Sequence, residues 1–99
     1  MCQEFSVLYV ALCLAQGYHS RLVVAMDKSI PFDWTGPHAW AEVRIDVVWV
    51  HVDPSDQVWN QTYHCRTWWW AKKVGSTVSI FGFEDGKVTD LTEKYACAN

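Results

Sequence analysis

Two neighbouring segments alternate between apolar and other side chains, and this pattern constrains the fold more than any other feature of the chain. Residues 38–45 carry Ala, Val and Ile at one parity, and residues 48–53 carry valines at one parity. A period of two indicates a β-strand with one face against a core. The other parity holds polar and aromatic side chains, so we expect that face to be functional or solvated. The short connection between the segments predicts an antiparallel hairpin.

The core faces of the two strands must meet in this hairpin, which predicts a register. The expected cross-strand pairs are Ala39 with Val52, Ala41 with Val50, and Val43 with Val48. The same register places His38 opposite Asp53, where Cβ atoms about 4.5–5.5 Å apart allow an imidazole–carboxylate hydrogen bond. A slip of one residue would turn valines to the wet face. Ile45-Asp46 is not a favoured two-residue turn, so we expect a four-residue loop in this register.

The rest of the chain predicts one helix and three more strands. Residues 2–16 contain neither Gly nor Pro and precede Gly17, which predicts a helix that ends there. Its circumference is mostly apolar, as is typical of a helix buried against a sheet. We expect strands at 21–26, 76–83 and 87–91, loops at 27–37 and 54–70 (the second with irregular or short helical pieces), a turn at 84–86 and a frayed tail after Tyr95.

Length and charge exclude several classes of protein. The chain has 99 residues, of which 51% are hydrophobic, so we expect a single domain over residues 1–99. The net charge is −3 and no basic cluster exists, which argues against a nucleic-acid partner. No apolar run reaches the roughly 18 residues of a membrane span, so we expect no membrane partner. No export signal is visible, and we expect a cytoplasmic protein.

The cysteines favour neither a metal site nor a disulfide scaffold. Cys2, Cys13, Cys65 and Cys97 form no C-x-x-C pair, so a structural zinc site is not expected. Two disulfides in a secreted chain are the alternative, which the absence of an export signal disfavours. Cys13 falls within the predicted helix and is interpreted as a small core residue. We expect no metal and no other cofactor.

Three residues together suggest nucleophilic catalysis. Cys2 stands at the start of the predicted helix, where the helix dipole favours a thiolate, and the hairpin register brings His38 to Asp53. A nucleophile, a base and a carboxylate that orients the base are the elements of acyl-transfer catalysis. A single Cys or His is more often a core or surface residue. The expected register of the hairpin nevertheless favours catalysis by Cys2, His38 and Asp53.

Other polar residues share the face of His38. Trp40 is a candidate substrate-binding residue that could wall a cleft, or it simply covers the sheet edge. Glu42 is interpreted as a solvated or salt-bridged strand residue. His51 faces Trp40 in the expected register, and we interpret it as a packing or cleft-wall residue.

These blocks resemble the transglutaminase-like superfamily. The segment Cys2-Gln3-Glu4-Phe5-Ser6 is similar to its nucleophile helix, Gly36-Pro37-His38-Ala39-Trp40 to its histidine strand, and Trp49-Val50-His51-Val52-Asp53-Pro54 to its aspartate strand. The resemblance implies an α+β fold in which the nucleophile helix packs on an antiparallel sheet, as in the cysteine proteinase core. It also implies a thioester acyl-enzyme formed on a protein or peptide amide. A second resemblance, to the peptide N-glycanase branch, rests on Asp33-Trp34-Thr35, Trp70-Ala71-Lys72-Lys73, and Asp90-Leu91-Thr92 with Tyr95.

The sequence departs from the superfamily pattern before the nucleophile. Only Met1 precedes Cys2, whereas the resemblance implies helices there that help to form the oxyanion hole. We therefore expect a truncated or minimal member of the superfamily, or a missing N-terminal segment that is supplied elsewhere, for example by a partner chain. Three functions stay open: a cysteine amide hydrolase or acyltransferase, a catalytically inactive binding module of the same fold, and an N-terminal nucleophile enzyme formed by loss of Met1.

Overall fold

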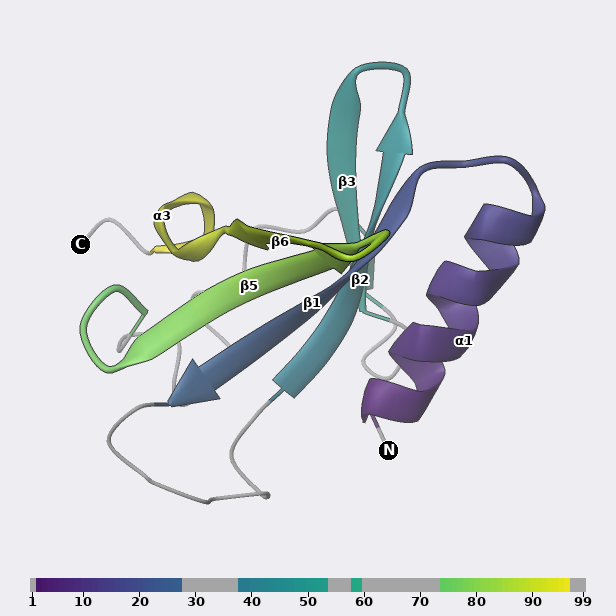
Figure 1. Ribbon diagram of the computed structural model, residues 1–99. Coiled ribbons are helices and arrows are strands. Elements are labelled where there is room, and N and C mark those ends of the chain that lie inside the picture. The colour runs from purple at the N-terminus through teal and green to yellow at the C-terminus, as the bar shows by residue number, and fades with distance from the viewer. Residues whose placement is uncertain (1, 28–37, 54–57, 60–73, 97–99) are drawn as a thin grey trace.

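The computed structural model describes residues 2–27, 38–53, 58–59 and 74–96. Within them the elements are α1 (Cys2–Ala15), β1 (Ser20–Asp27), β2 (His38–Ile45), β3 (Val48–Asp53), β4 (Val58–Trp59), β5 (Val78–Glu84), β6 (Lys87–Asp90) and α3 (Thr92–Tyr95). Figure 1 shows α1 standing beside the sheet, with α3 at the far end of the β5–β6 hairpin. No helix among the described residues is both long and apolar enough to cross a membrane.

The strands form one antiparallel sheet in the order β4-β3-β2-β1-β5-β6. A helix on an antiparallel sheet is an α+β arrangement, so that part of the predicted fold class is confirmed. The predicted hairpin strands over 38–45 and 48–53 have the observed bounds. The predicted end of α1 is also confirmed, since Gly17 follows it with a φ of 88°, a conformation that favours glycine.

One face of the sheet packs against α1. Val43, Val50 and Val52 form a buried cluster on this face, and Tyr9 and Cys13 of the helix pack against it. The prediction that α1 is buried is nevertheless wrong: Leu8 and Leu12 are each 57% exposed. The physical reason is that the sheet contacts one side of the helix, and within the described residues no other element covers the rest.

The opposite face carries the larger core. Its buried residues come from β1, β2, β5 and the C-terminal region: Val23, Ala25, Trp40, Val78, Ile80, Leu91 and Tyr95. The expectation of a solvated face is therefore wrong for Trp40 and Glu42, which have no exposed surface, whereas a functional role of this face stays a prediction. The expectation fails because α3, which covers this face, was not predicted from the short segment Thr92–Tyr95.

The hairpin register differs from the predicted one by two residues. Ala41 lies opposite Val52, and Val43 opposite Val50, so the apolar faces still meet. The expected four-residue loop is wrong, because pairing continues to Ile45 and Val48 and leaves a two-residue turn. Asp46 accepts this turn with a φ of 58°, a left-handed conformation that Asp tolerates better than most residues.

Gly82 leaves space on β5 for the side chains that cover it. A Cβ atom at this position would lie 2.9 Å from Leu91 Cδ1 and 3.1 Å from Arg21 Cδ. We expect Gly82→Ala to lower the free energy of unfolding by about 1–3 kcal/mol, the usual cost of overpacking a core. Urea unfolding measures this change. Lys87→Ala, an exposed change on the same hairpin, serves as the control and should stay within about 0.5 kcal/mol of wild type.

Candidate active site

His38 and Asp53 form the centre of the candidate site. His38 is the first residue of β2 and Asp53 the last of β3, and His38 Nε2 lies 2.5 Å from Asp53 Oδ2. The Asp53 side chain has no exposed surface, whereas that of His38 is 16% exposed. An ionised carboxylate can only accept hydrogen bonds, so with Asp53 ionised we assign the proton of this pair to Nε2. The arrangement fixes both the tautomer and the direction of the imidazole.

The contact arises from a different register than the one predicted. With Ala41 opposite Val52, Asp53 falls level with Trp40 rather than with His38. His38 and Asp53 are thus diagonal neighbours on one face, a separation that long or aromatic side chains bridge. The predicted hydrogen bond is present, although the predicted direct pairing is wrong.

The start of α1 lies near the start of β2. Ser6 Oγ donates a hydrogen bond of 3.1 Å to the carbonyl oxygen of Ala39, the residue after His38, and Ser6 is fully buried. Cys2 is the first residue of α1 and precedes Ser6 by one turn on the same helix face. Figure 1 shows the two N-terminal ends at the same end of the molecule. The position of the Cys2 thiol lies outside the described side chains.

Trp40 supports the ring of His38 from the core. The two rings are stacked, with centroids 5.7 Å apart and planes inclined by 28°. Trp40 has no exposed surface and its Nε1 donates a hydrogen bond of 3.1 Å to the Tyr95 hydroxyl. The structure therefore shows packing against His38; the predicted contact between Trp40 and a substrate stays a prediction.

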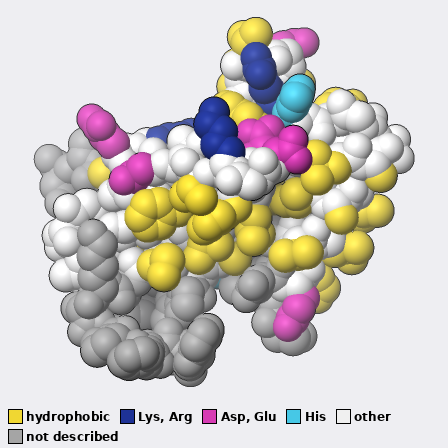
Figure 2. Space-filling view, in the orientation of Figure 1, with side chains coloured by type: hydrophobic (Ala, Val, Ile, Leu, Met, Phe, Trp, Pro, Cys, Tyr) yellow, Lys and Arg dark blue, Asp and Glu magenta, His cyan; other side chains and the backbone are white. Residues whose placement is uncertain are grey.

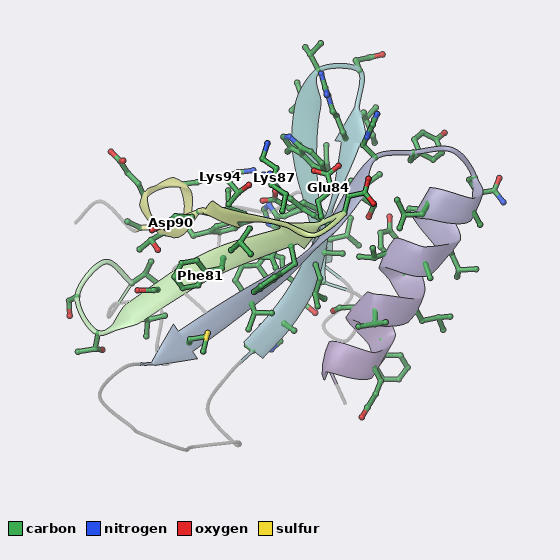
Figure 3. All side chains as sticks on the ribbon, viewed as in Figure 1. Phe81, Glu84, Lys87, Asp90 and Lys94 are labelled. Carbon is green, nitrogen blue, oxygen red and sulfur yellow. The ribbon has the colours of Figure 1, made fainter. Side chains whose placement is uncertain are left out.

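A buried charge cluster lies behind Trp40 on the same face. The Glu42 carboxylate has no exposed surface and receives Arg21 Nε at 2.7 Å and Lys94 Nζ at 2.8 Å. The Tyr95 hydroxyl donates a third hydrogen bond to it. Lys94, which Figure 3 labels, makes its contact with Glu42 from α3. Of the two interpretations of Glu42, the salt-bridged one is confirmed and the solvated one is wrong.

The cluster shifts the pKa values of its members in opposite directions. Burial by itself raises the pKa of Glu42, but the hydrogen bonds from Lys94 and Tyr95 and the charges of Lys94 and Arg21 outweigh it, so the pKa is lowered. Burial and the neighbouring Glu42 charge raise the pKa of Tyr95 well above its usual value. Glu42 is thus held as a carboxylate and Tyr95 as a neutral hydrogen-bond donor.

Sequence reasoning missed Arg21, Lys94 and Tyr95 as neighbours of the site. The alternation of β2 places Glu42 on the same face as His38, which was the available indication of a buried charge. Its partners come from β1 and α3, which are far from β2 in the sequence.

His51 packs edge-on against Tyr95 with ring centroids 5.9 Å apart, as its packing interpretation predicts. No group of three or more potential metal ligands occurs among the described residues.

Comparison with known proteins identifies the family. The profile of the transglutaminase-like superfamily matches residues 1–54, a segment that contains Cys2, His38 and Asp53. No curated protein and no solved structure matches the chain. The match covers more than half of the 99 residues, and the chain therefore belongs to the transglutaminase-like superfamily.

Proposed function

We propose that this domain catalyses amide hydrolysis or acyl transfer, with Cys2 as nucleophile, His38 as general acid and base, and Asp53 as the residue that orients His38. The observation that carries this proposal is the 2.5 Å contact between His38 Nε2 and the fully buried Asp53 carboxylate. A buried aspartate bound to one imidazole nitrogen assigns the acid–base role to the other nitrogen. The fold that this site implies is the cysteine proteinase core.

Each step of the reaction has a residue to perform it. His38 Nδ1 takes the proton of the Cys2 thiol, and the helix N-terminus stabilises the thiolate. The thiolate forms a C–S bond to the amide carbonyl carbon, and the imidazolium returns its proton to the nitrogen as the C–N bond breaks. The resulting thioester is then attacked by water, which yields an acid, or by an amine, which yields a new amide.

The start of α1 also offers one donor for the oxyanion of this reaction. The first backbone N–H groups of a helix have no acceptor within the helix, and the N–H of Cys2 is one of them. A donor aimed at the developing oxyanion stabilises the transition state by about 2.7–4 kcal/mol. A second donor supplied by a segment before Cys2 or by a partner chain completes the proposed oxyanion hole.

Selective alkylation of Cys2 tests the proposal. A free thiol with a pKa near 8.5 is only about 3% thiolate at pH 7, so a thiolate held by the helix and His38 should react with iodoacetamide at least about tenfold faster than Cys13. Peptide mass spectrometry gives the rate at each cysteine. Equal rates at Cys2 and Cys13 would contradict the proposal.

A matched pair of histidine variants controls this experiment. His38→Ala should abolish the preference for Cys2, because the imidazolium that stabilises the thiolate is lost. His19→Ala should leave the preference unchanged, because the side chain of His19 is 71% exposed and contacts Glu84 instead. Loss of the preference in both variants would point to a general effect on folding.

The substrate class is proposed from the superfamily alone. A protein side-chain amide or a peptide bond suits a thioester mechanism, and a glycosyl-asparagine amide is the form that the peptide N-glycanase branch implies. Of the segments that resemble this branch, 33–35 and 70–73 lie outside the described residues. Asp90, Thr92 and Tyr95 are described: Asp90 accepts the Thr92 N–H, Thr92 accepts the Ile80 N–H, and Tyr95 hydrogen-bonds with Trp40 and Glu42, so these residues attach α3 to the sheet. We place the reaction in the cytoplasm.

A non-catalytic binding role is the second candidate, and the exposed apolar surface favours it. Phe5 and Leu12 on α1 are 48% and 57% exposed, and Met26 and Phe83 on the sheet are 50% and 41% exposed. Figure 2 shows hydrophobic side chains gathered over α1 and over the sheet beside it. Extended apolar surface is typical of an interface. An acyl adduct on Cys2 after reaction with an activated ester would reject a purely binding role.

A further inference from the structure

A polar chain runs through the core that holds Trp40. The Tyr95 hydroxyl accepts a hydrogen bond from Trp40 Nε1 and donates one to Glu42, and both Tyr95 and Glu42 are buried. Apolar side chains such as Val23 and Ile80 surround this chain in the same core. Buried polar groups rarely stabilise a fold more than apolar side chains of similar size would. Their hydrogen bonds do favour one arrangement of the groups that they connect. The hydrogen bonds from Trp40 through Tyr95 to Glu42 therefore favour one orientation of the Trp40 indole.

The orientation of Trp40 bears on His38. A hydrogen bond from Nε2 to Asp53 sets the direction of the imidazole, but its angular tolerance still permits small changes in the torsions about the Cα–Cβ and Cβ–Cγ bonds of His38. The stacked indole, at 5.7 Å and 28°, presents a surface that opposes these changes. Asp53 and Trp40 therefore both restrain the plane in which His38 Nδ1 lies.

Tyr95 is itself held firmly against the sheet. The Leu91 N–H donates to the Ile80 carbonyl oxygen at 2.8 Å, and the Ile80 N–H donates to Thr92 Oγ1 at 2.9 Å. Its ring lies edge-on to Trp40, with centroids 5.1 Å apart and an angle of 77° between planes. α3 is thus attached at its start to β5, and Tyr95 at its end reaches into the core. A shift of α3 would therefore move Tyr95 and, through its contacts, the indole of Trp40.

We propose that Tyr95 is a positioning residue for His38, acting through the Trp40 indole. The inference rests on the proposed function, because it concerns the ring of the proposed base. Removing the Tyr95 hydroxyl takes away its hydrogen bonds with the Trp40 indole N–H and with the Glu42 carboxylate, which weakens the restraint on the tilt of the indole within the core. The imidazole follows, and Nδ1 spends less time in line with the Cys2 thiol.

Tyr95→Phe tests this role, because it removes only the hydroxyl and keeps the ring. The ring protons of His38 sense the ring current of Trp40, and in this variant we expect their NMR signals to move from the wild-type positions. The alkylation rate of Cys2 should fall about threefold to tenfold, the factor that one buried hydrogen bond supplies. Ile80→Val removes one methyl group from the same core without touching the polar chain. It should lower stability and leave both readouts unchanged.

A double-mutant cycle distinguishes a positioning role of Tyr95 from a general loss of stability. Trp40→Phe removes the indole N–H, so Tyr95→Phe should lower the Cys2 alkylation rate little further in that background. Independent losses of stability would instead multiply the two rate effects. If Tyr95→Phe does not fold, Trp40→Phe alone must reproduce the fall in Cys2 alkylation, and a wild-type rate in that variant overturns the inference.

The two readouts distinguish failure of this inference from failure of the proposed function. Unchanged His38 signals and an unchanged Cys2 rate in a folded Tyr95→Phe protein overturn the positioning role. If Cys2 shows no preferential alkylation even in wild type, the proposed function is rejected. In that case displaced His38 signals in Tyr95→Phe still support the path from Tyr95 through Trp40 to His38.

Discussion

Asp53→Asn is expected to lower the rate of acyl-enzyme formation by about 10⁴-fold, as the corresponding change does in a Ser-His-Asp triad. The asparagine amide can offer its NH₂ group to His38 Nε2, which stabilises the tautomer with the proton on Nδ1. That tautomer cannot accept the thiol proton. The burst of p-nitrophenol from p-nitrophenyl acetate measures the rate.

Asp46→Asn provides the matched control for this change. It makes the same chemical substitution on the same hairpin, at an exposed turn residue whose φ of 58° Asn also tolerates. We expect a wild-type burst rate from this variant. A loss of less than tenfold in Asp53→Asn, with the fold intact by circular dichroism, would remove Asp53 from the proposed mechanism.

Glu42→Gln is expected to lower the free energy of unfolding by about 3–5 kcal/mol, because it leaves a buried cation without its counter-charge. Arg21 is 7% exposed and holds Glu42 through two nitrogens, so its guanidinium remains in the core after the change. A chain of this length has a total stability of about 5–15 kcal/mol. The loss is therefore a large part of the total, and urea unfolding at pH 7 measures it.

The same cluster makes stability depend on pH in a predictable direction. The folded pKa of Glu42 is lowered from its ordinary value of 4.5, so its carboxylate stabilises the folded state above that pH. This contribution is lost as the pH falls through the lowered pKa and Glu42 takes up a proton. The difference in unfolding free energy between wild type and Glu42→Gln should therefore be largest near pH 7 and shrink below about pH 4.5.

Glu84→Gln serves as the control for both measurements. Glu84 also lies on a strand and contacts a histidine at 3.5 Å, but the partner is largely exposed. Exposed ion pairs contribute about 0–1 kcal/mol, so this variant should unfold close to wild type across the pH range. A Glu42→Gln protein as stable as Glu84→Gln would contradict a structural role for the cluster.

The sequence predicts much of the hairpin but not its register. Alternation determines which residues share a face, and Ala41, Val43 and Val50 do share one. A shift of two residues keeps every side chain on its face, so matching core to core cannot distinguish the two registers. The turn decides between them, and its outcome rested on Asp46 accepting a left-handed conformation.

The surroundings of the candidate site were less predictable than the pair at its centre. His38 and Asp53 lie on adjacent strands, so a local pattern sufficed to bring them together. Trp40 and Glu42 looked like residues of an open face because alternation reveals two faces and not what covers them. Their covering residues, Tyr95 and Lys94, come from a helix of four residues that has no periodic pattern to reveal it.

The contacts around the site join residues at very different separations along the sequence, which affects the order in which these contacts form during folding. His38 and Asp53 are 15 residues apart, whereas Trp40 and Tyr95 are 55 apart. Closing the longer loop costs more chain entropy, so the His–Asp pair can form with its hairpin before the indole gains its hydroxyl partner. If Tyr95 has the proposed positioning role, local opening of α3 separates two populations, both with a complete His–Asp pair but only one with the imidazole plane held through Tyr95 and Trp40. Hydrogen exchange at the Leu91 and Tyr95 amides reports the balance between them.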